Sequence, residues 1–165
     1  MKRFSFFILF IYITVLLYGC STVSNSSNFN LKKNEKFYVA NFKNNTETYL
    51  AGERASNITK SLLLAKGFNI VNASESSISE EKYDFEKIKQ MAKKSDATLL
   101  VFGEVNEWRY KTGIDGEPAV GLTISIYDID KGVVVWTGVG AKSGWGHESI
   151  TTIAQKLIND IINMK

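Results

Sequence analysis

Side chains with catalytic or metal-binding chemistry are few in this chain. It contains one histidine, His147, and one cysteine, Cys20, among 165 residues. Zinc hydrolysis and Cys/His catalysis both require several such side chains close together, and the composition does not supply them. No glycine-rich phosphate loop follows the first predicted strand, so nucleotide chemistry has no support either. The sequence therefore predicts no metal site and no cofactor, and His147 is interpreted as an exposed residue near a helix start.

Two carboxylates lie close together in the stretch YKTGIDGEPAVG. Asp115 and Glu117 are flanked there by glycines and by Pro118, the only proline of the chain. A glycosidase needs two facing carboxylates roughly 5 to 10 Å apart, usually from different elements. A Gly-Asp-Gly turn with solvated acids is the simpler interpretation. A further possibility is an acidic rim, in which the same loop from several subunits presents a ring of negative charge to a cation.

Trp145 stands between two glycines in the stretch AKSGWGHES, just ahead of a predicted helix. One interpretation is a hydrophobic staple that folds back over this helix. The other is an exposed indole at a membrane–water interface, which suits the amphipathic ring. Lys142 is close enough in the sequence to meet lipid head groups. Trp108 and Trp136 fall inside strand patterns, where packing in the core or on a sheet face is expected.

The N-terminus indicates that a membrane is close by. Lys2 and Arg3 precede an apolar run of about fourteen residues, which is typical of a signal peptide and short of the roughly 18 to 20 residues that span a bilayer. The run ends in LYGC, which resembles the lipobox of bacterial lipoproteins, where the cysteine is acylated. By resemblance to lipoprotein sorting signals, Ser21 favours the outer membrane. We therefore expect residues 1–19 to be a signal peptide and Cys20 to carry the lipid anchor on the periplasmic face.

The remaining chain has the length of one domain with a hydrophobic core. The full chain has 20 basic and 17 acidic residues, and Lys2 and Arg3 leave with the signal peptide. The remaining positive charges nearly balance the negative ones, and the sequence shows no clustered basic face of the kind that binds nucleic acid. The stretch STVSNSSNFN is polar and lacks periodicity. Residues 20–35 are therefore predicted to form a lipidated flexible tether, followed by a single α/β domain over residues 36–165.

The pattern of apolar residues predicts the element order βαβαβββα. Strands are expected at 36–42, 68–71, 98–110, 119–128 and 133–141, and helices at 49–66, 85–94 and 148–163. Gly67 is placed as a helix C-cap and Asp84 as an N-cap. A mixed β-sheet packed with helices is the simplest architecture for this order.

The predicted strand 119–128 alternates cleanly. One side carries Val120, Leu122, Ile124 and Ile126, and the other carries small or hydroxylated side chains together with Tyr127. The apolar side is expected to face the core. The other side is either solvated or pressed against a neighbouring subunit, and the sequence leaves these two alternatives open.

The segment EWRYKTGIDGEPAVG, followed by GVVVWTGVGAKSGWGHESITTIAQKL, resembles the PelC family, the outer-membrane lipoproteins of the Pel exopolysaccharide export system. The similarity is close over residues 107–157 and weaker over FYVANFKNNTETYLAGERASNITKSLLLAKG. It implies an α/β sandwich like the periplasmic domain of the curli secretion lipoprotein CsgG, assembled into a dodecameric ring. It also implies an acidic funnel that guides a partly deacetylated, cationic polysaccharide to the outer-membrane β-barrel of PelB.

The resemblance also implies roles for single residues. Trp145 would be the membrane-facing aromatic residue of each subunit, with its flanking glycines letting the indole project from a loop. Asp115 would belong to the acidic pore ring, with Glu117 as a neighbouring candidate, while His147 replaces an expected arginine. The function implied is a non-enzymatic homo-oligomer whose partners are a PelB-like barrel, a cationic polysaccharide and outer-membrane lipids. The alternative is a lipid-anchored binding module that activates or scaffolds a cell-wall enzyme.

Overall fold

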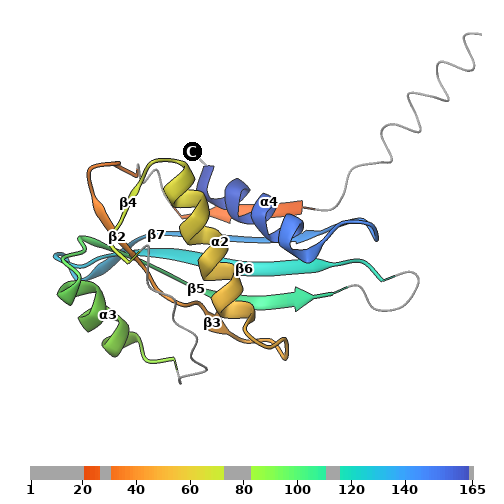
Figure 1. Cartoon of the computed structure of the whole chain (residues 1–165), viewed down its shortest axis with the longest axis horizontal. Helices are drawn as coiled ribbons and strands as arrows, with labels where there is room; N and C mark the ends of the chain where they lie inside the picture. Colours follow the sequence, from red (N-terminus) through yellow and green to blue (C-terminus); the bar gives the residue numbers. More distant parts are fainter. Residues whose placement is uncertain (1–20, 27–30, 73–82, 111–115, 164–165) are drawn as a thin grey trace, which may run out of the picture.

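The computed structural model describes residues 21–26, 31–72, 83–110 and 116–163. Over these residues seven strands form one mixed sheet in the order β1-β7-β6-β5-β2-β4, with β3 paired to β5 (Figure 1). The strands are β1 (Ser21–Asn25), β2 (Lys36–Val39), β3 (Lys43–Asn44), β4 (Asn69–Ile70), β5 (Leu99–Arg109), β6 (Ala119–Asp128) and β7 (Val133–Ser143). The described helices are α2 (Ala51–Ala65), α3 (Phe85–Lys94) and α4 (Ile150–Asn163). The predicted α/β class, a mixed sheet packed with helices, is confirmed.

The long strands β5, β6 and β7 form an antiparallel meander, and β2 joins β5 in parallel. The alternation of β6 is as predicted, because Val120, Leu122, Ile124 and Ile126 are all at most 3% exposed and belong to the main core. The helices α2 and α4 supply the rest of this core and together form the helix layer on that face of the sheet (Figure 1). In the described part of the chain, no helix has the length and apolarity needed to cross a bilayer.

Helix α3 packs on the opposite face of the sheet, over one end only. Phe85 contacts the rings of Phe102 and Tyr127 at centroid distances of 4.9 and 5.7 Å. Asp84 caps the helix as predicted, since its Oδ1 accepts from the backbone N–H groups of Glu86 and Lys87 at 3.0 and 3.1 Å. Half of this sheet face is therefore covered by α3, and the half toward the ends of β5 and β7 has no described helix on it.

The prediction of a flexible tether over residues 20–35 is wrong for Ser21–Asn25, which form β1. This strand pairs antiparallel with β7 at the sheet edge, and Ser26 extends the pairing through its backbone N–H to the carbonyl of Thr137 at 3.0 Å. The polar sequence gave no local sign of a strand. Its order comes from the unpaired backbone groups that the edge strand β7 offers, together with Val23, which packs against the main core.

Candidate functional site

Four strand ends lie level at one end of the sheet. β6 begins at Ala119, which is paired with Arg109 at the end of β5 and with Ser143 at the end of β7. β1 begins beside them at Ser21, on the other edge of β7. We call this end the strand tip, and it includes residues 116–118 and 144–149 (Figure 1, right).

Trp145 lies in a hydrogen-bonded turn of the strand tip. Its backbone N–H donates to Glu148 Oε2 at 2.9 Å, and the backbone N–H of Glu148 donates back to the Trp145 carbonyl at 2.8 Å. The other carboxylate oxygen of Glu148 accepts from Lys156 Nζ at 2.6 Å. The hydrogen bond from Lys156, and after it the one from Trp145, hold the pKa of the Glu148 carboxyl below its ordinary value. The backbone that carries the indole is thus held in place.

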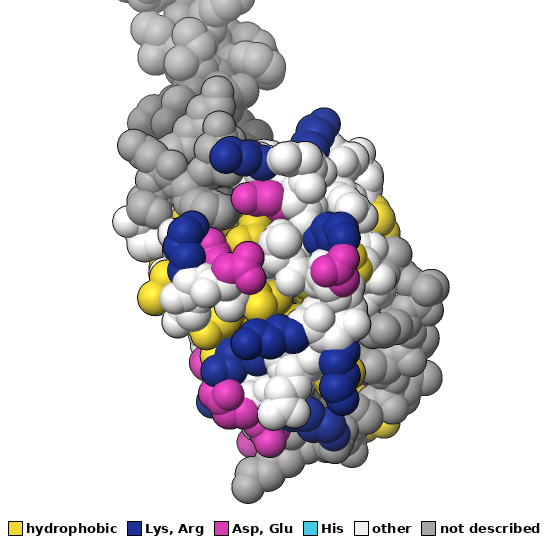
Figure 2. Space-filling view, turned by 90° about the vertical axis from the view of Figure 1, so that its left-hand side faces the viewer, with side chains coloured by type: hydrophobic (Ala, Val, Ile, Leu, Met, Phe, Trp, Pro, Cys, Tyr) yellow, Lys and Arg dark blue, Asp and Glu magenta, His cyan; other side chains and the backbone are white. Residues whose placement is uncertain are grey.

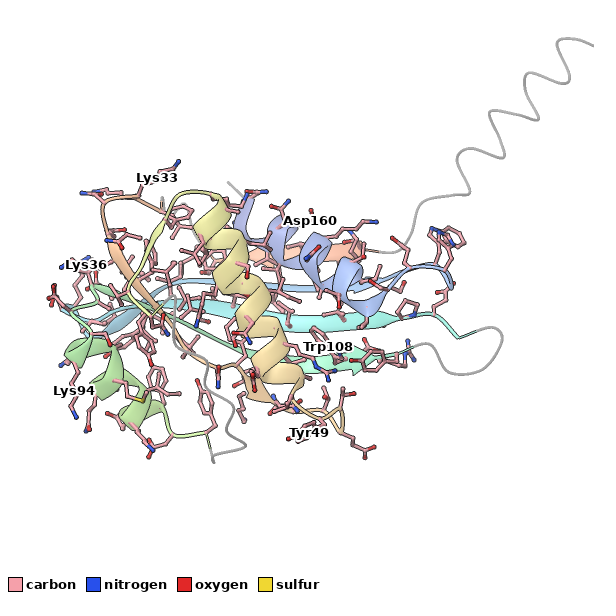
Figure 3. The ribbon with its side chains drawn as sticks, in the orientation of Figure 1. Lys33, Lys36, Tyr49, Lys94, Trp108 and Asp160 are labelled. Atoms are coloured by element: carbon pink, nitrogen blue, oxygen red, sulfur yellow. The ribbon has the colours of Figure 1, made fainter. Side chains whose placement is uncertain are left out.

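The Trp145 side chain is 42% exposed and belongs to neither buried apolar cluster. The indole is therefore exposed in this chain, and the staple interpretation finds no support. Trp108 and Trp136 are only 3% and 6% exposed, so the prediction that they pack within the sheet core is confirmed. Figure 3 shows Trp108 beside α2.

Gly144 joins two loops of the strand tip. Its N–H donates to the carbonyl of Pro118 at 2.8 Å, which ties the Trp145 turn to the loop carrying Glu117. A Cβ at Gly144 would lie 2.2 Å from Ile153 Cδ1, in the buried core under α4. This glycine is therefore needed for close packing against the helix, and not for freedom of the loop as the sequence suggested.

Of the two predicted acidic residues, Glu117 lies on the strand tip. Glu117 is exposed and directly precedes Pro118, which is buried. Asp115 lies outside the described residues, so its place in a ring stays a prediction. Sequence reasoning missed a nearby contact, in which the Arg54 guanidinium of α2 donates to the Tyr110 hydroxyl at the end of β5. The two residues are 56 positions apart, so no local sequence pattern links them.

The other predicted membrane residues differ in their surroundings. Lys142 is only 22% exposed at its side chain and pairs with Asp160 of α4 at 2.9 Å, so it must leave this pair to reach a head group. His147 is exposed on the Trp145 turn. Cys20 lies outside the described residues, but it directly precedes Ser21, and consecutive Cα atoms are about 3.8 Å apart.

The described residues away from the strand tip form no metal centre. Among residues 21–26, 31–72, 83–110 and 116–163, no group of three or more His, Cys, Asp or Glu side chains is placed to hold a metal ion. At the end opposite the strand tip, lysines are interspersed with acids, as Figure 2 shows. Lys36 pairs with Asp96 there, and Lys131 pairs with Asp128 at 2.6 Å. This face lacks the single-sign patch of a nucleic-acid interface.

The fold defines the class of protein first: it is an α/β domain with a mixed sheet. The lipoprotein GNA1162 from Neisseria meningitidis matches with a TM-score of 0.57 over 78% of this chain and 96% of its own, and its 13% identity shows the fold alone. Two structures of the PelC dodecamer from Paraburkholderia phytofirmans, one of a leucine-to-methionine variant, match far more closely. They are 33% identical, with TM-scores of 0.73 and 0.72, over 87% of this chain and 96% of theirs.

The chain therefore belongs to the PelC family. It matches no protein-family model, and no curated protein matches it significantly.

Proposed function

We propose that this protein is an outer-membrane lipoprotein that forms a periplasmic ring and guides a cationic exopolysaccharide to an export barrel of the PelB type. One observation supports this function above the others. The strand tip brings together the start of β1 next to Cys20, the exposed Trp145 and the loop that carries Glu117.

The lipid anchor and the indole would act on the same membrane surface. Buried acyl chains contribute roughly 0.8 kcal/mol per methylene, so more than one chain holds the protein stably at the bilayer. Because β1 begins one residue after Cys20, the acylated end has almost no tether, and the strand tip faces the lipid. An exposed tryptophan at that surface places its ring at the level of the head groups.

The acidic loops would supply the guidance. The similar PelC proteins were crystallised as dodecamers, and in a ring of this chain each subunit contributes one Glu117 and one Asp115. Carboxylates brought within the roughly 8 Å Debye length of one another make a common negative potential, which attracts a polycation and orients it along the axis. Guidance of this kind breaks no covalent bond, so the protein is not an enzyme and uses no cofactor.

The test is the assembly state of the mature, acylated chain extracted from membranes into nanodiscs, by mass photometry and electron microscopy. A closed ring with a central opening, with every strand tip on the bilayer side, is the expected result. A monodisperse monomer at all concentrations would contradict the proposal. It would favour the alternative, a lipid-anchored module that activates or scaffolds a cell-wall enzyme.

A further inference from the structure

One half of the sheet face opposite the helix layer is uncovered among the described residues. We call this half the open face. It consists of Thr22 and Ser24 of β1, Thr137, Val139 and Ala141 of β7, Gly121, Thr123 and Ser125 of β6, and Glu104, Asn106 and Glu107 of β5. The hydroxyls of Ser125 and Thr137 lie 2.9 Å apart across two strands of this face.

The open face has the composition of a contact surface. A solvated sheet face usually carries long charged side chains, but the strip along β6, β7 and β1 is short and uncharged. Val139 is 47% exposed at its centre. A hollow of about 420 Å³ lies here, between Thr22, Asn106, Gly121 and Val139 among others. Charged residues are depleted from the cores of protein interfaces in the same way.

The boundary with α3 places the acidic residues of the open face at its β5 margin. Burial, and secondly the carboxylate of Glu104, raise the pKa of Tyr83 just before α3 to about 12. Glu107 follows along the same margin and pairs with Arg109 at 3.4 Å, at the strand tip. The margin of the open face therefore carries two carboxylates, the Arg109 guanidinium and the exposed Lys43 of β3, which is registered with Glu104.

The outer surface of the helix layer has matching properties. Its exposed side chains are Arg54, Asn57, Ser61, Leu64 and Ala65 of α2, and Thr151, Thr152, Gln155, Lys156 and Asn163 of α4. Arg54 and Lys156 are the cations among these, and Asp160 of α4, with a side chain that is 43% exposed, adds a carboxylate to this surface. Leu64 is 42% exposed without a described apolar layer over it. This surface is mostly uncharged, like the open face.

We propose that the open face packs against the helix layer of a second copy of this chain. The inference rests on the proposed ring. A ring needs a head-to-tail contact between two different surfaces of each subunit, and a sheet face against a helix layer is such a contact. Two open faces packed on each other would instead bring the Glu104 and Glu107 margins of both copies together and close at a dimer.

This contact also orients the subunits. Successive copies are stacked across the sheet plane, so the strands run transverse to the stacking direction. In a cyclic ring all subunits point the same way along the axis, so with the strands along this axis every strand tip lies on one rim. The lipid anchors and the Trp145 indoles of all copies would thereby meet a single bilayer, without any further contact between the tips.

The first test compares two valine substitutions in the mature, acylated chain. Val139→Arg places a long cation at the centre of the open face. Val133→Arg is the matched control, since Val133 is equally exposed at 49% but lies at the far end of β7 and on the other side of the strand. Mass photometry of nanodisc-extracted protein is expected to show loss of the ring for Val139→Arg and an intact ring for Val133→Arg. If Val139→Arg fails to fold, Ala141→Arg replaces it.

The second test identifies the partner surface by cross-linking. Thr123→Cys and Ser61→Cys are made separately, and the wild-type chain with Cys20 alone gives the background. A thiol cross-linker is expected to join the two variants only when they are mixed. Cross-linked pairs of Thr123→Cys with itself would overturn the sheet-to-helix contact. If the wild type forms a ring and Val139→Arg forms one too, the open-face interface is overturned while the proposed function stands. A monomeric wild type would instead contradict the proposed function.

Discussion

The backbone N–H of Gly144 donates a 2.8 Å hydrogen bond to the carbonyl of Pro118. This bond joins the turn that presents Trp145 to the loop that presents Glu117. The loops that carry the residues proposed for membrane contact and for the acidic ring are therefore held together at Gly144. Gly144 in turn packs against Ile153 of α4. A change that displaces Gly144 is expected to disturb both proposed functions at once.

Gly144→Ala is predicted to destabilise the domain. The added Cβ would lie 2.2 Å from the buried Ile153 Cδ1, so either the loop or α4 must shift. Overpacking of this kind costs about 1 to 3 kcal/mol of the free energy of unfolding. Urea denaturation followed by circular dichroism measures the loss, and polymer secretion is expected to fall with it.

Gly146→Ala is the matched control for this substitution. Gly146 is exposed, on the other side of Trp145, and its φ is not in the left-handed region. Its free energy of unfolding should stay within about 0.5 kcal/mol of the wild type. Equal losses in both variants would show that the loop, and not the packing of Gly144 on α4, sets the stability.

Trp145→Ala is predicted to weaken membrane contact without unfolding the domain. Because the indole is 42% exposed, its removal should cost no more than about 1 kcal/mol of stability. In vesicles with brominated lipids, the wild-type fluorescence should be quenched through Trp145, and the residual fluorescence of Trp145→Ala should not. Quenching that persists in the variant would place the membrane contact elsewhere.

Trp108→Ala provides the contrast. Its side chain is 3% exposed in the main core, so truncation should cost about 3 to 5 kcal/mol. If Trp145→Ala were as destabilising as Trp108→Ala, the indole would have a structural role and the membrane interpretation would fail.

Much of the fold was predictable because its elements carry strong local patterns. The strict alternation of β6 fixed both its core side and its outer side, and Asp84 fixed the start of α3. The helix predicted at 49–66 is observed at Ala51–Ala65 and is followed by Gly67 with a φ of 81°. These features depend on residues close together in the sequence, which is why a sequence pattern reveals them.

The missed features all depend on tertiary contacts. β1 is polar and takes its structure from the edge of β7, and β3 is two residues long. The Lys142–Asp160 ion pair joins a strand to a helix, and no hydrophobic periodicity of the sequence predicts it. The role of Gly144 is visible only once Ile153 is placed beneath it. At the strand tip, therefore, the sequence indicated which residues matter but not what holds them.

The Glu148 carboxyl is predicted to make the Trp145 turn sensitive to acid. Its pKa is lowered in the folded chain, chiefly by the hydrogen bond from Lys156. The unfolded chain therefore binds a proton at this carboxyl more tightly than the folded chain does. The ionised carboxylate stabilises the fold at pH values above the ordinary glutamate pKa, and this stabilisation is lost as the pH falls through the lower pKa of the folded chain. The loss should be below about 1 kcal/mol, since Lys156 is half exposed.

Glu148→Gln tests this linkage, because it removes the charge and keeps the shape. Urea midpoints from pH 3 to 8 should show the wild type more stable than the variant at neutral pH, with the difference vanishing in acid. Glu47→Gln makes the same substitution at an exposed position away from the turn and serves as the control. A difference between wild type and Glu148→Gln that is constant with pH would mean that the ionised carboxylate does not support the turn.

Charge reversal in the acidic loop is predicted to impair polymer export. Glu117→Lys and Asp115→Lys each replace a carboxylate by a cation in every subunit, so the ring would repel a polycation where it had attracted it. Since Glu117 is exposed, the free energy of unfolding should change by no more than about 0.5 kcal/mol. Secreted polysaccharide is the readout, alongside the assembly state of each variant.

Asp130→Lys makes the same change in net charge at the opposite end of the sheet, where Asp130 is exposed in the β6–β7 turn. Export should be normal in this control if guidance depends on the strand tip and not on overall charge. Raised ionic strength should reduce the wild-type attraction for a cationic oligosaccharide, because screening shortens the Debye length from about 8 Å at 0.15 M to about 3 Å at 1 M. Normal secretion from both loop variants, with intact rings, would remove the acidic ring from the mechanism and leave the protein an anchor or scaffold.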